Sequence, residues 1–379
     1  MNSIDTLESF ATRLRRHMSS SIEAAAFNDL ALELFALQFE HNPAYRRFCR
    51  GRRVSPAGIP RWEQIPAIPA RAFKEGELSC LPAEERSVVF FSSGTTEHLP
   101  SRHFHNHESL QIYETSLLRC FRVHLLQDAS NNSALRALAL TPTSAHAPHS
   151  SLVHMFETLQ HHLGLARFSF TGTTTEDGVW ELDRQETIEL LQAAVLANEP
   201  VMLLGTAFSF VHLLDHMARR NLAMRLPAGS RVMETGGYKG RSRVLSKPEL
   251  HSFIASRLGI ELSHIVCEYG MSELSSQAYD RVSWSQNQPV RDALFGDAVG
   301  EETCRFRFPS WVRVQIVSPE TGREVLEGQT GLIRVLDLAN VYSVMAIQTE
   351  DLAVRRTDGF ELIGRADLAE VRGCSLMSA

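Results

Sequence analysis

The sequence has 379 residues, 44% of them hydrophobic, so it can bury a substantial core and is long enough for two or three structural units. Its 38 lysines and arginines against 44 aspartates and glutamates give a net charge of −6 without long blocks of either sign, which argues against nucleic acid or an anionic membrane as the main partner. No stretch reaches the ~20 apolar residues that cross a bilayer, and the N-terminus lacks the features of a secretion signal, so we expect a cytoplasmic protein.

Helical and strand patterns alternate through the first 300 residues. Apolar periodicity predicts helices at 4–18, 22–40 and 186–198, and the last two end near Pro43 and Pro200. Short apolar runs predict buried strands, several of them followed directly by Gly, Ser or Thr, at 88–91, 201–204, 231–233 and 265–267. This alternation is typical of an α/β fold with parallel sheets, in which ligands bind at the carboxyl ends of the strands.

After about residue 300 the pattern changes to alternating strands with glycine-containing turns between them, at 312–317, 332–338 and 360–363. We therefore predict an α/β body over residues 1–300, which includes the N-terminal helices, and a smaller β-rich unit with a C-terminal tail over residues 301–379. The six cysteines have none of the paired spacing of zinc sites, and we expect them to be reduced thiols.

A cluster of hydroxyl side chains directly follows the first predicted strand. It consists of Ser92, Ser93, Gly94, Thr95 and Thr96. Hydroxyl donors and backbone N–H groups around one glycine can bind a polyphosphate. The cluster is not the P-loop of common ATPases, because no Gly-Lys-Ser/Thr follows. In isolation such a cluster is also typical of a plain turn.

A second group follows the predicted strand at 265–267. Tyr269 can flank a purine, and Gly270 permits close approach of the backbone. Ser272 can donate to a phosphate, and Glu273 can hold Mg²⁺. Taken alone, the segment could equally be an ordinary loop.

Two more segments near the C-terminus carry charged residues suited to a nucleotide. Asp351, in a short acidic triplet, could accept both ribose hydroxyls. Arg365 offers a rigid fork of donors to phosphate or ribose, and Asp367 follows where the chain could bend. Solvated turns and surface salt bridges are the alternative interpretations of these two segments.

In this order and spacing, the four segments resemble the adenylate-forming superfamily of acyl-CoA ligases, peptide-synthetase adenylation domains and luciferases. Within it the chain is most similar to the acyl-protein synthetases of bacterial luminescence systems, a resemblance that extends to residues 66–69, 73–74, 148–152, 204–208 and 235–238. It implies the N-terminal body of that fold, with two parallel-sheet subdomains and a small antiparallel β subdomain. The mobile C-terminal domain of the wider superfamily, with its catalytic lysine, is expected to be absent. Glu97 departs from the glycine that usually closes the phosphate loop.

The resemblance also implies roles for individual residues in binding ATP and Mg²⁺. The hydroxyl cluster at 92–96 would hold the β- and γ-phosphates. Gly236, Gly237 and Tyr238 would border the adenine and acyl sites. Ser272 would contact the α-phosphate, Glu273 would ligate Mg²⁺, and the pair at 351 and 365 would grip the ribose.

The C-terminal tail would carry the acylated cysteine of such synthetases, here Cys374. The candidate catalytic residues are then Ser272, Arg365 and Cys374. The expected reaction is ATP-dependent activation of a carboxylic acid, expected to be a fatty acid, followed by transfer of the acyl group to a protein thiol and onward to a partner such as a fatty-acyl reductase. The alternatives are transfer to coenzyme A, an amine or another small acceptor, and a non-catalytic nucleotide-binding interaction module. An incidental terminal thiol is the alternative for Cys374.

Two further patterns invite functional interpretations that we do not favour. His103, His105 and His107 alternate on one strand face, as metal ligands can, but no fourth ligand is suggested nearby. An apolar set that could line an acyl tunnel is better explained by core packing of a helix; it comprises Phe208, Phe210, Leu213 and Leu214.

Overall fold

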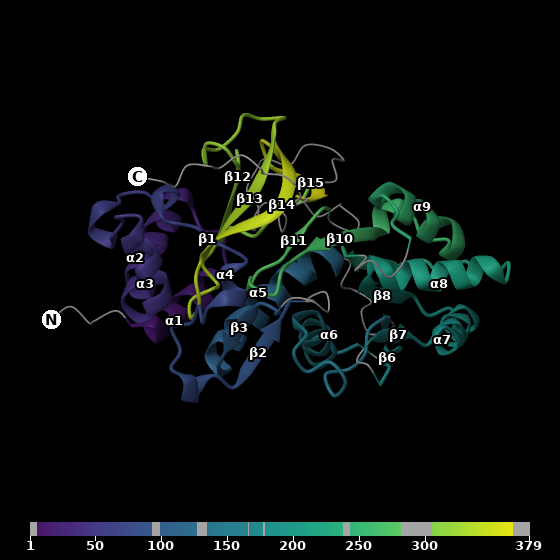
Figure 1. Ribbon diagram of the computed structural model, residues 1–379. Coiled ribbons are helices and arrows are strands. Elements are labelled where there is room, and N and C mark those ends of the chain that lie inside the picture. The colour runs from purple at the N-terminus through teal and green to yellow at the C-terminus, as the bar shows by residue number, and fades with distance from the viewer. Residues whose placement is uncertain are drawn as a thin grey trace.

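The computed structural model describes residues 6–92, 99–126, 135–165, 167–176, 179–237, 243–281 and 305–366 (Figure 1). Its α-helices are α1 Leu7–His17, α2 Ala24–His41, α3 Pro43–Gly51, α4 Ala72–Glu75, α5 His107–Leu125, α6 Ser151–His162, α7 Arg184–Ala197, α8 Ala207–Arg219 and α9 Lys247–Leu258. Its strands are β1 Ile68–Pro69, β2 Val88–Phe91, β3 Arg102–His105, β4 Arg136–Ala139, β5 Arg167–Phe170, β6 Gly172–Thr174, β7 Trp180–Leu182, β8 Val201–Thr206, β9 Arg231–Thr235, β10 Ile265–Tyr269, β11 Ala278–Tyr279, β12 Val312–Val317, β13 Thr330–Asp337, β14 Ala346–Arg356 and β15 Gly359–Arg365. Within these ranges, no helix combines the length and the apolar character needed to cross a membrane.

A six-stranded sheet forms the centre of the α/β body, in the order β11-β10-β9-β8-β4-β5. Its strands are parallel except for the short edge strand β11, which runs antiparallel to β10. Strand β8 is buried along its whole length, as expected for a strand covered on both faces. Its successive side chains alternate between two cores: Met202 and Leu204 pack in the larger one, and Val201 and Leu203 in the smaller one.

The smaller core lies between this sheet and the helices α7, α8 and α9, which Figure 1 shows together at one end of the molecule. Phe210, Leu213 and Leu214 of α8 are fully buried in it, which confirms core packing for this part of the apolar set. The larger core includes residues of α5 and α6 and continues into the N-terminal helices and the second large sheet.

The second large sheet has the order β1-β14-β13-β12, with β15 paired to the remaining part of β14. Its strands are antiparallel apart from the short parallel pair β1–β14. The N-terminal helices pack against this sheet region, where Gln38 of α2 donates to the carbonyl of Asn340 at 2.7 Å. In Figure 1 the sheet lies between these helices and the α7–α9 group. Strand β1 also shows that the predicted β-rich unit at 301–379 takes part of its sheet from the N-terminal half.

The predicted α/β class, with parallel pairing in the body and an antiparallel β-rich unit, is confirmed. The resemblance implied two parallel sheets in the body. Within the described residues, the six-stranded sheet is the one whose strands are mainly parallel. The predicted strand at 88–91 is present as β2, but it pairs antiparallel with β3, with Val88 opposite His105. The physical reason is the short connection between the two strands, since a parallel pair needs a crossover of a dozen or more residues.

The other predicted strands of the α/β body extend further than their apolar runs. Strand β8 continues to Thr206, β9 to Thr235 and β10 to Tyr269. Thr206 lies opposite Thr235, and Thr235 lies opposite Glu268, so the three strands end at the same level. The residues predicted to bind a nucleotide beyond β9 and β10 therefore leave the sheet at neighbouring points of one edge.

Candidate active site at the strand ends

The turn after β9 leaves open space beside its backbone. Gly237 has φ +105°, a conformation that favours glycine. A Cβ atom built on Gly236 or Gly237 would have no heavy atom within 4 Å. A ligand can thus approach the backbone of this turn closely, as expected for residues that border a nucleotide or acyl site. Tyr238 lies outside the described residues.

A hydrogen bond joins the end of β10 to the second sheet. The hydroxyl of Tyr269 donates to Oδ2 of Asp351 at 2.8 Å, although the two residues are 82 positions apart. Asp351 pairs across the β14–β15 hairpin with Arg365, whose Nε lies 3.9 Å from Oδ1 of the carboxylate. Burial raises the pKa of Asp351, while the Tyr269 bond and the Arg365 charge lower it. The structure thus brings together three of the residues predicted for purine and ribose contacts.

The Tyr269 ring is enclosed by its neighbours, whereas the Arg365 side chain is exposed. The Tyr269 ring makes edge contacts with Phe306, Phe308 and Phe360, at centroid distances of 6.0, 6.1 and 5.6 Å. Its exposed fraction is 6%. The Arg365 side chain is 74% exposed, so it can turn toward a ligand at little cost. Tyr269 is therefore a fixed donor to Asp351, whereas Arg365 is an adjustable cation beside it.

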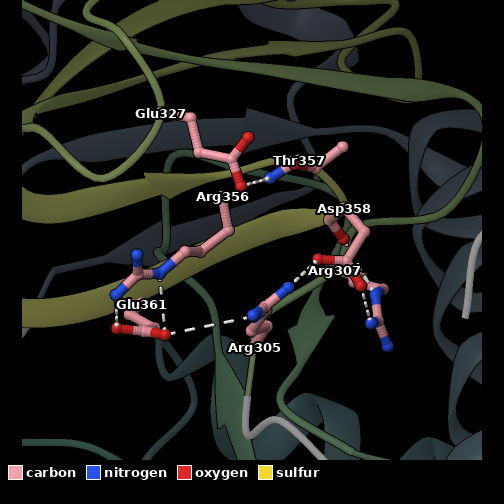
Figure 2. A network of polar contacts seen from close by, with 7 residues as sticks. All are labelled: Arg305, Arg307, Glu327, Arg356, Thr357, Asp358 and Glu361. Carbon is pink, nitrogen blue, oxygen red and sulfur yellow. Dashed lines mark hydrogen bonds and ion pairs between the residues drawn. The ribbon is translucent and has the colours of Figure 1, made fainter. Parts of the chain in front are cut away.

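Ion pairs attach the turn of the β14–β15 hairpin to the segment that precedes β12 (Figure 2). Asp358 bonds to Arg305 at 2.6 Å, and it also accepts from Arg307. Arg356 forms a bidentate pair with Glu361, with distances of 2.8 and 2.7 Å. These contacts support the hairpin that carries Asp351 and Arg365.

The loop after β10 carries Ser272 and Glu273, both nearly buried. The Ser272 hydroxyl donates to Oε2 of Glu273 at 3.1 Å. The backbone of both residues is anchored: the Ser272 carbonyl accepts from Nδ1 of His103, and the Glu273 carbonyl accepts from Nδ2 of Asn340, each at 2.9 Å. A carboxylate beside a hydroxyl supplies the oxygen donors that Mg²⁺ prefers, so the two side chains fit the predicted metal.

Glu268 is a buried carboxyl group at the same strand end that the sequence analysis did not single out. Burial raises the pKa of Glu268 to about 7, with a smaller opposing effect of the bond from Thr235 and a further increase from Glu234. A Cβ atom at Gly270 would collide with Oε1 of Glu268, so the glycine provides room for this carboxyl group. The sequence does contain a sign of this buried carboxyl group, because a glutamate within an apolar strand must be buried.

The first predicted phosphate residue, Ser92, closes the β2–β3 hairpin. Its Oγ accepts from the backbone N–H of Ser101 at 2.9 Å. The rest of the hydroxyl cluster lies outside the described residues, as does the tail with Cys374. The three alternating histidines do not share one strand face, because His103 and His105 are buried on β3 whereas His107 begins α5. The described part of the chain contains no group of three or more metal-ligating side chains.

Three residues that anchor this region were not identified from the sequence: His103 on β3, Asp337 at the end of β13, and Asn340 in the turn that follows. Asp337 is fully buried and accepts from the backbone N–H of Ser275 at 3.0 Å and from the hydroxyl of Ser276 at 2.8 Å. An acidic residue within the apolar run at 332–338 was the available signal, since a buried charge requires partners.

Comparisons with known proteins identify the family of this chain. The family model described as acyl-protein synthetase, LuxE, matches residues 16–379. Two curated relatives are both named long-chain-fatty-acid–luciferin-component ligase. The protein from Aliivibrio fischeri is 21% identical over 364 residues, covering 92% of this chain and 87% of the relative. The protein from Vibrio harveyi is 20% identical over 352 residues, covering 90% and 84%.

The fold is also similar to that of solved adenylate-forming ligases. A crystal structure of 2-hydroxyisobutyryl-CoA ligase in the postadenylation state, in complex with 2-HIB-AMP, matches with a TM-score of 0.63 and 15% identity. The match covers 93% of this chain and 70% of that protein. Because the family model spans nearly the whole sequence, including every strand end described above, the chain belongs to the LuxE family of acyl-protein synthetases.

Proposed function

We propose that this chain uses ATP and Mg²⁺ to activate a long-chain fatty acid as its acyl-adenylate and transfers the acyl group to its own Cys374. Membership of the acyl-protein synthetase family makes the chain an AMP-forming ligase that acts on a fatty acid. The names of the curated relatives support a long-chain acid.

The observation that carries the assignment of the nucleotide site is the bond between Tyr269 and Asp351. It places a carboxylate suited to two ribose hydroxyls against the strand end from which the Ser272–Glu273 loop departs. Asp351 would accept the ribose hydroxyls, and Arg365 would turn toward ribose or phosphate. The open Gly236–Gly237 turn would lie beside the adenine and acyl groups. The hydroxyl cluster at 92–96 would hold the β- and γ-phosphates.

Glu273 would hold Mg²⁺, with Ser272 next to it as a donor to the α-phosphate. When bound, the ion would reduce the negative charge of the phosphates. The chain's own part is to present the Glu273 carboxylate and the Ser272 hydroxyl in a fixed geometry, while Arg365 supplies a further positive charge. This matters because both reactants are anions, and catalysis must bring them together in line.

The proposed chemistry has two steps. In the first, an oxygen of the fatty carboxylate bonds to the α-phosphorus of ATP and pyrophosphate leaves. No general base is needed, because the carboxylate is already ionised at neutral pH. In the second, the Cys374 thiolate bonds to the acyl carbon, AMP leaves, and a thioester remains. A partner protein such as a fatty-acyl reductase would then take the acyl group.

Acid-dependent exchange of label between pyrophosphate and ATP tests the first step. We expect exchange with long-chain fatty acids to exceed exchange with short-chain acids. We also expect Glu273→Gln to reduce the exchange by at least about 100-fold, the scale of losing one electrostatic group in the reaction. Circular dichroism would check that the variant folds. Exchange at the unaltered rate in a folded Glu273→Gln protein would contradict the metal assignment.

A further inference from the structure

The backbone of the loop at 271–276 is held by three buried side chains from two other parts of the chain. His103 belongs to β3, and Asp337 and Asn340 belong to the end of β13 and the turn after it. Their exposed fractions are 2%, 0% and 1%. We call these three residues the loop clamp. They bond to the Ser272 carbonyl, the Ser275 N–H and the Glu273 carbonyl respectively.

The bond from His103 has a defined direction. A carbonyl oxygen only accepts, so Nδ1 of His103 carries the proton and donates it to the Ser272 carbonyl. Burial lowers the pKa of His103 to about 4, so the ring is neutral at physiological pH. Since β3 pairs with β2, this bond also ties the hairpin that leads into the hydroxyl cluster to the Ser272–Glu273 loop.

Asn340 and Asp337 hold the other side of the loop. Nδ2 of Asn340 donates to the carbonyls of Glu273 and Val344, at 2.9 and 3.0 Å. Asp337 accepts from Ser275, from Ser276 and from the backbone N–H of Ala339, so its carboxylate joins the loop to its own turn. All these groups are shielded from water, where a lost hydrogen bond leaves a buried polar group unpaired.

We propose that the loop clamp positions Ser272 and Glu273 for the metal and the α-phosphate, so that His103, Asp337 and Asn340 are positioning residues of the adenylation reaction. The inference rests on the proposed function of Ser272 and Glu273. The clamp bonds to Ser272, Glu273 and Ser275 go to backbone groups of the loop, so a clamp variant keeps the Ser272 and Glu273 side chains themselves. A clamp variant would lower the reaction rate by displacing the Ser272 and Glu273 side chains. Displacements of about 1 Å can cost on the order of 100-fold in rate.

A matched set of variants tests the clamp through His103. Leucine at 103 fills similar space but cannot donate, whereas asparagine can direct its amide N–H at the same carbonyl. His105→Leu is the control, because His105 is equally buried on the same strand face and bonds to Ser109 rather than to the loop. Asn340→Ala is the second clamp variant and replaces His103→Leu if that protein does not fold.

Two quantities are measured in each folded variant. The first is amide hydrogen exchange of residues 271–276 without nucleotide, and the second is the Mg²⁺ concentration that gives half-maximal pyrophosphate exchange. We expect His103→Leu and Asn340→Ala to raise both by about tenfold or more, the scale of one buried hydrogen bond. His103→Asn should stay within about threefold of the wild type, and His105→Leu should change neither quantity.

Equal changes of the two measured quantities in His103→Leu and His105→Leu would contradict the proposed role of the loop clamp. Wild-type amide exchange in both clamp variants would contradict it as well. The amide measurement needs no catalysis, so it decides the anchoring even if Glu273→Gln retains wild-type Mg²⁺ dependence. That last result would instead contradict the metal assignment under the proposed function.

Discussion

The loop at 271–276 and the β14–β15 hairpin both carry residues expected to contact the nucleotide, and different forces hold them. The loop is anchored by hydrogen bonds that His103 and Asn340 donate and that Asp337 accepts, and all three residues are nearly inaccessible to water. The hairpin turn is attached by ion pairs of Asp358 with Arg305 and Arg307, and Arg356 pairs with Glu361 within the hairpin; all of these pairs remain partly exposed (Figure 2). Buried bonds leave unpaired polar groups when broken, whereas exposed ion pairs are screened by water and salt. The loop should therefore be rigid and sensitive to single substitutions, and the hairpin more tolerant.

The largest effect is expected from Asp337→Ala, which removes the acceptor of three hydrogen bonds inside the buried region. The N–H groups of Ser275 and Ala339 and the hydroxyl of Ser276 would lose their partner. We expect the free energy of unfolding to fall by about 2–4 kcal/mol. Urea unfolding measures it, and a loss below about 1 kcal/mol would show that the buried anchor contributes no more than an exposed one.

The second effect concerns Glu268, which is buried beside the loop without an ion-pair partner in the described chain. Its folded pKa of about 7 lies above the ordinary value of 4.5, so the folded state binds more protons between these values. Proton binding by Glu268 therefore favours the folded state at low pH. This stabilisation is lost as pH rises from about 4.5 to 7.

Glu268→Gln should remove that dependence. Compared with the wild type, the variant should gain stability progressively over this pH window, by up to about 3 kcal/mol above pH 7. The measurement is the difference in unfolding free energy between the two proteins at pH 5 and pH 8. A constant difference would show that Glu268 does not titrate abnormally in the folded protein.

A smaller effect is expected from Tyr269→Phe at the junction between the two regions. The variant keeps the ring among its three phenylalanine neighbours but loses the bond to Asp351. We expect a stability loss of about 1 kcal/mol and a rise in the KM for ATP of about threefold to tenfold. An unchanged KM would show that Tyr269 does not orient Asp351 for ribose binding.

The smallest effect is expected from Asp358→Asn in the hairpin turn. Its ion pairs with Arg305 and Arg307 are partly exposed, so the expected loss is about 1 kcal/mol or less at low salt. At 1 M NaCl the difference from the wild type should shrink, because the Debye length falls to about 3 Å. A loss as large as that of Asp337→Ala would remove the contrast between the two regions.

The sequence predicts the local features of this fold well because they depend on short-range patterns. The apolar runs locate β2 and β12 at their observed limits, and the glycine pair after β9 marks the open turn. The antiparallel pairing of β2 with β3 was missed, because an apolar run does not reveal its partner.

The sequence pointed to residues that we propose to face the nucleotide, and it did not reveal the residues that support them. Tyr269, Asp351 and Arg365 belong to segments whose chemistry suits a nucleotide, and they lie together in the structure. His103 and Asn340 reach the same loop from 169 and 67 residues away. No local pattern in the sequence specifies contacts between residues so far apart in the chain. The positions of Ser93 to Thr96, Tyr238 and Cys374 stay predictions.

Intact-protein mass spectrometry after incubation with a long-chain fatty acid, ATP and Mg²⁺ tests the central claim most directly. The account predicts one hydroxylamine-sensitive acyl adduct on the wild-type protein. It predicts none on Cys374→Ser, which should still catalyse pyrophosphate exchange, because adenylation does not need the thiol. The same adduct on Cys374→Ser would place the acyl group on another residue. Acid-dependent exchange without any adduct on the wild type would contradict transfer to a protein thiol and favour a small-molecule acceptor.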